Sequence, residues 1–190
     1  GFGWKPLRAR VPIWIAATSA TGLRMAGALG DGVLLNTVAS PEYSANAIAL
    51  VRAAVEAEGK DWSTFEVAQL INTSVEDDPA RAIDAVRWEV ATKFLPGKFQ
   101  TQAGPRVRVG EPYIDASLVP GLEEAHRRGG PEALARALPA EMVAGLTAAG
   151  TPDGVVKRIQ RYRDAGVRLP IVRPAAPHQT QPIIDLFSPR

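Results

Sequence analysis

The sequence predicts an α/β fold in which parallel strands alternate with helices. Apolar runs rich in β-branched and aromatic residues have the character of buried strands at residues 11–17, 33–35, 65–75 and 169–172. The segments between them place apolar residues at helical spacing and open on typical helix-start residues. Strands that alternate with helices in this way are typical of a parallel sheet covered by helices.

The composition excludes several classes of protein. The chain has 190 residues, no cysteine and 46% hydrophobic residues, so it can bury a sizeable core without disulfides. No run has the length of a membrane span and no signal pattern is visible, which favours a cytoplasmic chain with no membrane partner. The net charge is +2 and the arginines are scattered, so nucleic acid is not an expected partner. Gly1 in place of Met suggests a processed or excised piece.

The first strand-helix unit contains the candidate anion site. Residues 11–17 read as a strand buried on both faces, residues 18–22 as a tight turn, and residues 23–29 as a short helix closed by Gly30. Small residues let backbone N–H groups approach a ligand, and the N-terminus of the helix adds a positive dipole end. A phosphate fits there, but the spacing alone favours the simpler interpretation that Thr18, Ser19 or Thr21 merely caps the helix. The residues concerned are Ala17, Thr18, Ser19, Ala20 and Thr21.

The middle of the chain continues the alternation. Ser40-Pro41-Glu42 predicts the start of a helix that runs to about residue 58, where Gly59 stops it. The strand at 65–75 ends in the polar residues 72–74, which either line a pocket at the carboxyl end of the strand or simply turn the chain. Residues 76–79 then begin a helix to about residue 94, in which Trp88 is interpreted as a packing residue.

We predict a single domain over residues 1–190, with a lead-in at 1–10 and an irregular excursion with short helices at 96–150. Arg106 and Arg108 in this excursion could meet an anion, but a solvated loop is the safer interpretation. Helix starts are expected at Pro131 and Pro139, after a break at residues 129–130.

The last unit begins at Thr151-Pro152-Asp153, which repeats the helix-start chemistry. Its expected buried stripe lies opposite a basic face that we interpret as solvated. Gly166 ends the helix, the strand at 169–172 follows, and a short helix at 179–187 closes the chain. The stripe is Val155, Val156, Ile159 and Tyr162, and the basic face is Lys157, Arg158, Arg161 and Arg163.

Two blocks of sequence carry a resemblance to a known family. Residues 12–36, P-I-W-I-A-A-T-S-A-T-G-L-R-M-A-G-A-L-G-D-G-V-L-L-N, resemble the segment of luciferase-like flavin or deazaflavin oxidoreductases that commonly reads P-I-x-x-A-A, a Gly-Pro-type turn, A-G and D-G-V. Residues 148–167 are similar to that family's G-T-P-E-E-V helix before its last barrel strand. The chain departs from the family at Thr18, Ser19 and Ala20, where many members have Gly-Gly or Gly-Pro.

The resemblance implies a (β/α)8 TIM-barrel type of fold, of which this chain would be the C-terminal half. It would contain about four parallel strand-helix units, corresponding to strands 5–8, whereas a complete barrel needs eight strands and about 250 residues. Four strands alone leave two open edges. We therefore expect a homo-oligomer or a complex with an N-terminal half, and we expect the chain by itself not to turn over.

The function implied by the resemblance is that of a luciferase-like monooxygenase type of oxidoreductase. It would use reduced FMN or coenzyme F420 for hydride transfer or oxygen insertion on a small organic substrate. The turn from Ala17 to Thr21 would bind the cofactor, and Asn36, Thr37 and Arg173 would bind the substrate. No catalytic residue is assigned, since those of the family mostly lie on the first strands, and no metal is expected.

Two other functions stay open at this point. A non-catalytic phosphate-ligand-binding half-barrel, active only with a partner, is favoured by the missing strands and by the presence of only two histidines, His126 and His178, neither of which lies in an active-site motif. A barrel hydrolase or isomerase is less well supported, because no Ser-His-Asp arrangement or cluster of metal ligands is visible.

Overall fold

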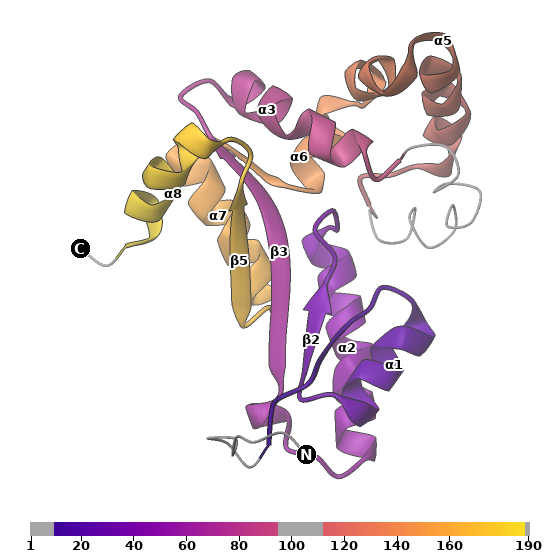
Figure 1. Ribbon diagram of the computed structural model, residues 1–190, viewed down its shortest axis with the longest axis vertical. Coiled ribbons are helices and arrows are strands. Elements are labelled where there is room, and N and C mark those ends of the chain that lie inside the picture. Colours follow the sequence, from indigo (N-terminus) through magenta and orange to yellow (C-terminus); the bar gives the residue numbers. More distant parts are fainter. Residues whose placement is uncertain (1–9, 95–111, 189–190) are drawn as a thin grey trace, which may run out of the picture.

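The computed structural model describes residues 10–94 and 112–188 (Figure 1). The strands of this part form a single parallel sheet, in the order β1-β2-β3-β4 with β5 paired to β3. The predicted α/β class is therefore confirmed. The strands are β1 (Trp14–Ala16), β2 (Gly32–Leu35), β3 (Glu66–Val75), β4 (Ala148–Gly150) and β5 (Leu169–Pro174).

One face of the sheet is covered by α1 (Ala20–Leu29), α2 (Pro41–Ala57) and α7 (Pro152–Asp164). Each helix begins at a hydroxyl N-cap that satisfies a first-turn N–H group. The Ser40 side chain accepts from Tyr43 N–H, and the Thr151 side chain accepts from Gly154 N–H. Apolar residues of these helices and of the strands then form the main core, which includes Leu23, Val33, Val51, Ile71 and Val155.

A second core lies at the top of Figure 1, beyond the carboxyl end of β3. It contains α3 (Pro79–Ala91), α5 (Val119–Ala137) and α6 (Ala140–Gly145). The break predicted at residues 129–130 is confirmed, because α5 kinks where Gly130 adopts a φ of 67° and Pro131 restarts the helix. Short 3-10 turns at Trp62–Thr64, Ala116–Leu118 and Pro177–Gln179 and the final helix α8 (Thr180–Phe187) complete this part of the chain.

Strand β3 organises the sheet, because it pairs with β2, β4 and β5. The backbone groups of successive residues in a strand bond alternately to the two edges. Glu66 N–H donates to Asp31 and Glu76 N–H donates to Gly150, whereas Thr73 C=O accepts from Ala175 N–H. Hence β2 and β4 lie along one edge of β3 and β5 lies along the other.

Strand β1 corrects the expectation of a strand buried on both faces. Trp14 and Ala16 are exposed and Ile15 is half-buried. The physical reason is that β1 is an edge strand, and the sheet face opposite α1, α2 and α7 has no covering layer at this strand among the described residues. Apolar composition alone cannot distinguish a strand that is covered on both faces from an edge strand with one face uncovered.

Several boundaries also differ from the prediction. Helix α1 begins at Ala20, three residues early, because Ser19 is its N-cap. Strand β5 includes Arg173 rather than ending before it. Strand β4 was not predicted, since its Ala-Ala-Gly sequence carries no strand signal.

The two faces assigned to the last long helix also need correction. Val156 is 40% exposed and does not belong to the buried stripe, whereas Val155, Ile159 and Tyr162 do. Arg158 is half-buried and bonded to backbone carbonyls, so the basic face is only partly solvated. Arg106 and Arg108 lie outside the described residues. Within residues 10–94 and 112–188, no helix combines the length and apolar character that a membrane span requires.

Candidate functional site

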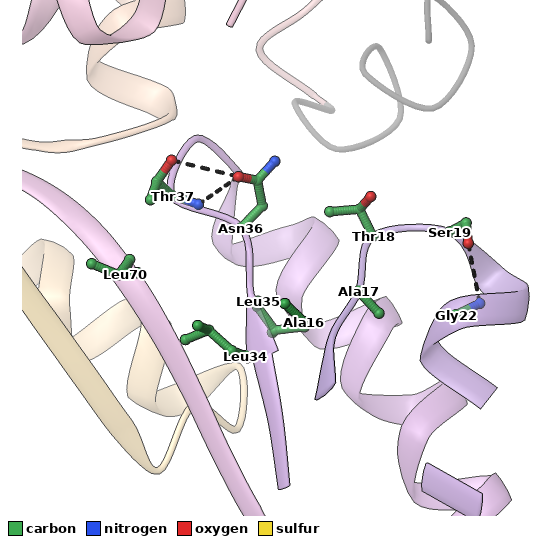
Figure 2. A pocket seen from close by; sticks show the side chains of 10 residues that line it. All are labelled: Ala16, Ala17, Thr18, Ser19, Gly22, Leu34, Leu35, Asn36, Thr37 and Leu70. Atoms are coloured by element: carbon green, nitrogen blue, oxygen red, sulfur yellow. Dashed lines mark hydrogen bonds between the residues drawn. The ribbon is translucent and has the colours of Figure 1, made fainter. Parts of the chain in front are cut away.

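A pocket of about 470 Å³ opens at the carboxyl ends of β1 and β2 (Figure 2). Its volume lies within the usual range for small-molecule sites. The segment after β1 and the segment after β2 form two polar sides, and aliphatic side chains form the wall between them. The wall consists of Ala16, Leu34, Leu35 and Leu70, and the polar sides contribute Ala17, Thr18, Ser19, Gly22, Asn36 and Thr37.

The first polar side is the turn that the sequence predicts to bind an anion. The Ser19 hydroxyl accepts from Gly22 N–H at 3.1 Å, and Ser19 C=O accepts from Leu23 N–H at 2.8 Å. Because these bonds use the N–H groups of Gly22 and Leu23, those of Ala20 and Thr21 remain as first-turn donors for a ligand. Ala20 and Thr21 are exposed on α1 beside the pocket and do not line it.

The second polar side is the turn that follows β2. Asn36 Oδ1 accepts from Thr37 N–H at 2.8 Å and lies 3.5 Å from Thr37 Oγ1 (Figure 2). This local bond fixes the carbonyl oxygen of the Asn36 amide and leaves its NH₂ group as a donor. Both residues are half-buried and line the pocket, and their role in binding substrate stays a prediction.

Three residues that the sequence analysis did not single out hold the two turns in place. Tyr43 on α2 donates its hydroxyl to Thr18 C=O at 2.6 Å. Gln69 on β3 donates its amide to Asn36 C=O at 3.3 Å, and its own oxygen lies 2.8 Å from the Ser44 hydroxyl. Gln69 is fully buried. A glutamine inside the apolar run 65–71 was the available signal, because a buried amide requires partners.

The segment after β2 is held from a third direction by Tyr162. Its hydroxyl donates to Ala39 C=O at 2.8 Å, and the ring is almost fully buried. Burial raises the pKa of the Tyr162 phenol well above its usual value, so the hydroxyl remains protonated and continues to donate. The helix α7 therefore anchors the chain just beyond Asn36 and Thr37.

Arg173 does not line this pocket. It lies on β5, and its guanidinium approaches Glu89 of α3 at 3.2 and 3.4 Å. In the sheet it stands beside Asn72, whose amide is buried and has no hydrogen-bond partner among the described residues. Asn72 shares the sheet face of Leu70, two residues away, so a polar pair adjoins the apolar wall.

Among the residues that the structure describes, none that lines the pocket is charged. Any anion there would be held by backbone N–H groups, hydroxyls and the dipole of α1 rather than by a cation. Within the part of the chain that the structure describes, no group of three or more acidic or imidazole side chains is placed to hold a metal ion. The arrangement can bind and orient a ligand, but it supplies no acid or base.

The sequence matches the model of one protein family. The model, described as luciferase-like monooxygenase, covers residues 2–169. The chain belongs to this family. The resemblance carried by residues 12–36 and 148–167 is thereby confirmed.

Curated members of the luciferase-like monooxygenase family match most of this chain. It is 30% identical over 165 residues to 5,10-methylenetetrahydromethanopterin reductase of Archaeoglobus fulgidus, an alignment that covers 87% of this chain and 48% of the relative. It is 25% identical over 171 residues to phthiodiolone/phenolphthiodiolone dimycocerosates ketoreductase of Mycobacterium bovis, covering 88% and 44%. The chain therefore spans about half the length of the curated relatives it matches.

Solved structures of luciferase-like TIM-barrel enzymes share this fold. The coenzyme F420-dependent tetrahydromethanopterin reductase of Methanopyrus kandleri superposes with a TM-score of 0.70 at 24% identity, covering 86% of this chain and 45% of that one. An F420-dependent secondary alcohol dehydrogenase in complex with an F420-acetone adduct gives 0.64 at 21% identity, covering 91% and 46%. The sheet and helices are thus those of part of a TIM barrel.

Proposed function

We propose that this chain is the cofactor-holding half of an oxidoreductase that uses reduced FMN or coenzyme F420 on a small organic substrate. The observation that carries the proposal is the pocket at the carboxyl ends of two adjacent parallel strands. Thr18 and Ser19 lie on one side of it, and Asn36 and Thr37 lie on the other. Among the similar solved structures, two have names that state coenzyme F420, one is an EDTA monooxygenase, and one is a riboflavin lyase solved with a modified FMN.

The residues present fit such a cofactor. The turn at Ser19 and the first N–H groups of α1 suit a phosphate, and Leu34 and Leu70 offer an apolar surface to a flat ring. A bound flavin or deazaflavin would supply the hydride or oxygen chemistry, and the part of the protein is to hold and orient it. Asn36 and Thr37, on the opposite side of the pocket, would then contact the substrate.

Exchanging Ser19 for aspartate tests the cofactor side. Aspartate is as good an N-cap as serine, so α1 should keep its start. The new carboxylate would oppose an anion at the same place. We expect Ser19→Asp to raise the dissociation constants of FMN and coenzyme F420, measured by fluorescence titration, by at least about tenfold, or roughly 1.4 kcal/mol.

The matched control is Ser19→Asn, which caps the helix without a charge. It should bind the cofactor within about threefold of the parent chain, and both variants should show the parent's circular dichroism. Equal dissociation constants for the parent and Ser19→Asp would refute the placement of the phosphate at this turn. A visible spectrum of the loaded chain would show which of the two cofactors it retains.

Exchanging Thr37 for valine tests the substrate side. Valine keeps the β-branched shape and removes the hydroxyl, which costs about 1 kcal/mol where that hydroxyl bonds to a ligand. With the assembled enzyme and a small ketone such as acetone as the probe, we expect the Michaelis constant to rise about fivefold while the dissociation constant of the cofactor stays the same. Thr18→Val, on the cofactor side, should give the reverse pattern, and the opposite assignment would contradict this orientation.

The second candidate function is a non-catalytic half-barrel that binds a phosphate-bearing ligand. It is favoured by one observation, namely that the described residues that line the pocket include no titratable side chain. Under this function, an assembled complex would bind FMN or coenzyme F420 with the Ser19→Asp effect but would show no hydride transfer to acetone.

A further inference from the structure

The sheet face opposite α1, α2 and α7 has the composition of a barrel interior, and we call it the inner face. Its apolar residues are Trp14, Ala16, Leu34, Ala68, Leu70, Leu169 and Ile171, which alternate along their strands with residues packed on the helices. Glu66, Asn72 and Arg173 add polar groups to the same face. Trp14, Leu169 and Ile171 are 39%, 45% and 36% exposed. Parallel sheets normally bury both faces, so this apolar surface lacks a partner among the described residues.

Side-chain sizes on the inner face also follow the pattern of a filled barrel. One row across the sheet reads Ala16, Leu34, Ala68 and Leu169, alternating small and large. At the N-terminal end, Trp14 extends over Gly32, where an added Cβ would lie 3.0 Å from the indole ring. The indole therefore narrows the N-terminal end of the inner face, where a hollow of about 710 Å³ lies beside it.

Two open edges bound the inner face. The outer edge of β1 carries the N–H and C=O groups of Trp14 and Ala16, because the neighbouring positions bond to β2. The outer edge of β5 carries the carbonyls of residues 170, 172 and 174, but only Val172 donates there, since positions 170 and 174 are prolines. Donors on β1 and acceptors on β5 complement each other.

We propose that the inner face is covered by a second copy of this chain, and that two chains close one eight-stranded barrel. A twofold axis along the barrel keeps all strands pointing the same way, so β1 of each copy can pair in parallel with β5 of the other. Four strands of each chain line the interior, namely β1, β2, β3 and β5. Two chains would together supply eight strands, which is the number in a complete (β/α)8 barrel.

Charge at the N-terminal rim agrees with self-association. Arg10 and Asp31 form an ion pair at 2.6 Å, and Glu66 and Arg168 line the same 710 Å³ hollow. Because charges of both signs are present on this rim, the rims of two twofold-related copies do not repel each other as surfaces of a single charge would.

The second copy also supplies the missing wall opposite Thr18 and Asn36, since the ligand pocket opens toward the inner face.

The full 190-residue chain should show the mass of two chains in size-exclusion chromatography with light scattering. Ile171→Asp would place two carboxylates in the closed interior, and we expect the dissociation constant of the dimer to rise at least about 100-fold. The matched control is Leu29→Asp, which changes a 68% exposed leucine on α1 and should leave the mass unchanged. Both variants should keep the parent's circular dichroism.

Amide hydrogen exchange on the unmodified chain gives an independent measurement in case Ile171→Asp does not fold. Dilution below the dissociation constant should speed exchange at Trp14, Ala16 and Val172, and it should leave Val33 in the centre of the sheet unchanged. A single-chain mass at all concentrations would overturn the proposal and would favour a separate half-barrel as the occupant. A dimer that Leu29→Asp breaks and Ile171→Asp does not would overturn it as well.

Discussion

Replacing Gly27 with alanine is expected to lower the free energy of unfolding by about 2 kcal/mol or more. An added Cβ would lie 2.5 Å from Val51 C=O and 2.8 Å from Ala54 Cβ. Neither atom belongs to a flexible side chain end, so α1 and α2 would have to separate. The loss should exceed the gain of up to about 1 kcal/mol that alanine brings to a helix interior. Urea denaturation followed by circular dichroism measures the difference.

The matched control is Gly121→Ala on α5, where an added Cβ meets no atom within 4 Å. This variant should be as stable as the parent or up to about 1 kcal/mol more stable. Two equally stable variants would show that α1 and α2 do not depend on their close approach. Because α1 carries the Ser19 turn, Gly27→Ala should also weaken cofactor binding even where the chain still folds.

Replacing Arg158 with methionine is expected to cost about 3 kcal/mol. Its guanidinium donates to the carbonyls of Ala144 at 3.0 Å, Thr147 at 3.2 Å and Gly145, and it lies 5.3 Å from the centre of the Tyr113 ring. Bonds from a charged donor contribute about 1.5–3 kcal/mol, and the half-buried carbonyls would lose their partner. The measurement is again the urea midpoint. The lost hydrogen bonds belong to the turn between α6 and β4.

One further variant separates the roles of charge and shape at this position, and a second serves as a control at an exposed neighbour. Arg158→Lys keeps the charge but not the planar fork, so we expect an intermediate loss. Lys157→Met, at the exposed neighbouring position, should change the stability by no more than about 0.5 kcal/mol. If Arg158→Met left the free energy of unfolding unchanged, water would have to replace the guanidinium at these carbonyls.

Much of the fold could be predicted because local chemistry and tertiary structure agree. Ser40 and Thr151 cap the helices that their sequence context predicts, and Gly59 with a φ of 67° ends the first of them. Two features depend on distant contacts and were therefore missed. Strand β4 exists because Ala148 pairs with Thr73, and Arg158 is half-buried because α6 ends against it.

The candidate site could be predicted in part for the same reason. Ser19 and Asn36 follow adjacent strands in the sequence, and parallel strands bring such positions to one edge of the sheet. The supports of the site could not be predicted in this way. Tyr43 and Gln69 reach Thr18 and Asn36 from other elements, and their hydrogen bonds follow from the packing of α2 and β3.

The position of β3 between β2 and β5 favours an order of folding in which local elements form first. β5 pairs with β3 across roughly 100 residues, and closing so long a flexible loop costs about 4 kcal/mol of chain entropy. α3, α5 and α6 lie inside that loop and have a core of their own, so their early collapse would shorten the effective closure. The β1-α1-β2-α2 segment is local and can form before β5 leaves the ribosome. The helices α3, α5 and α6 would then help β5 to pair with β3 during folding, as well as cover the carboxyl ends of the strands.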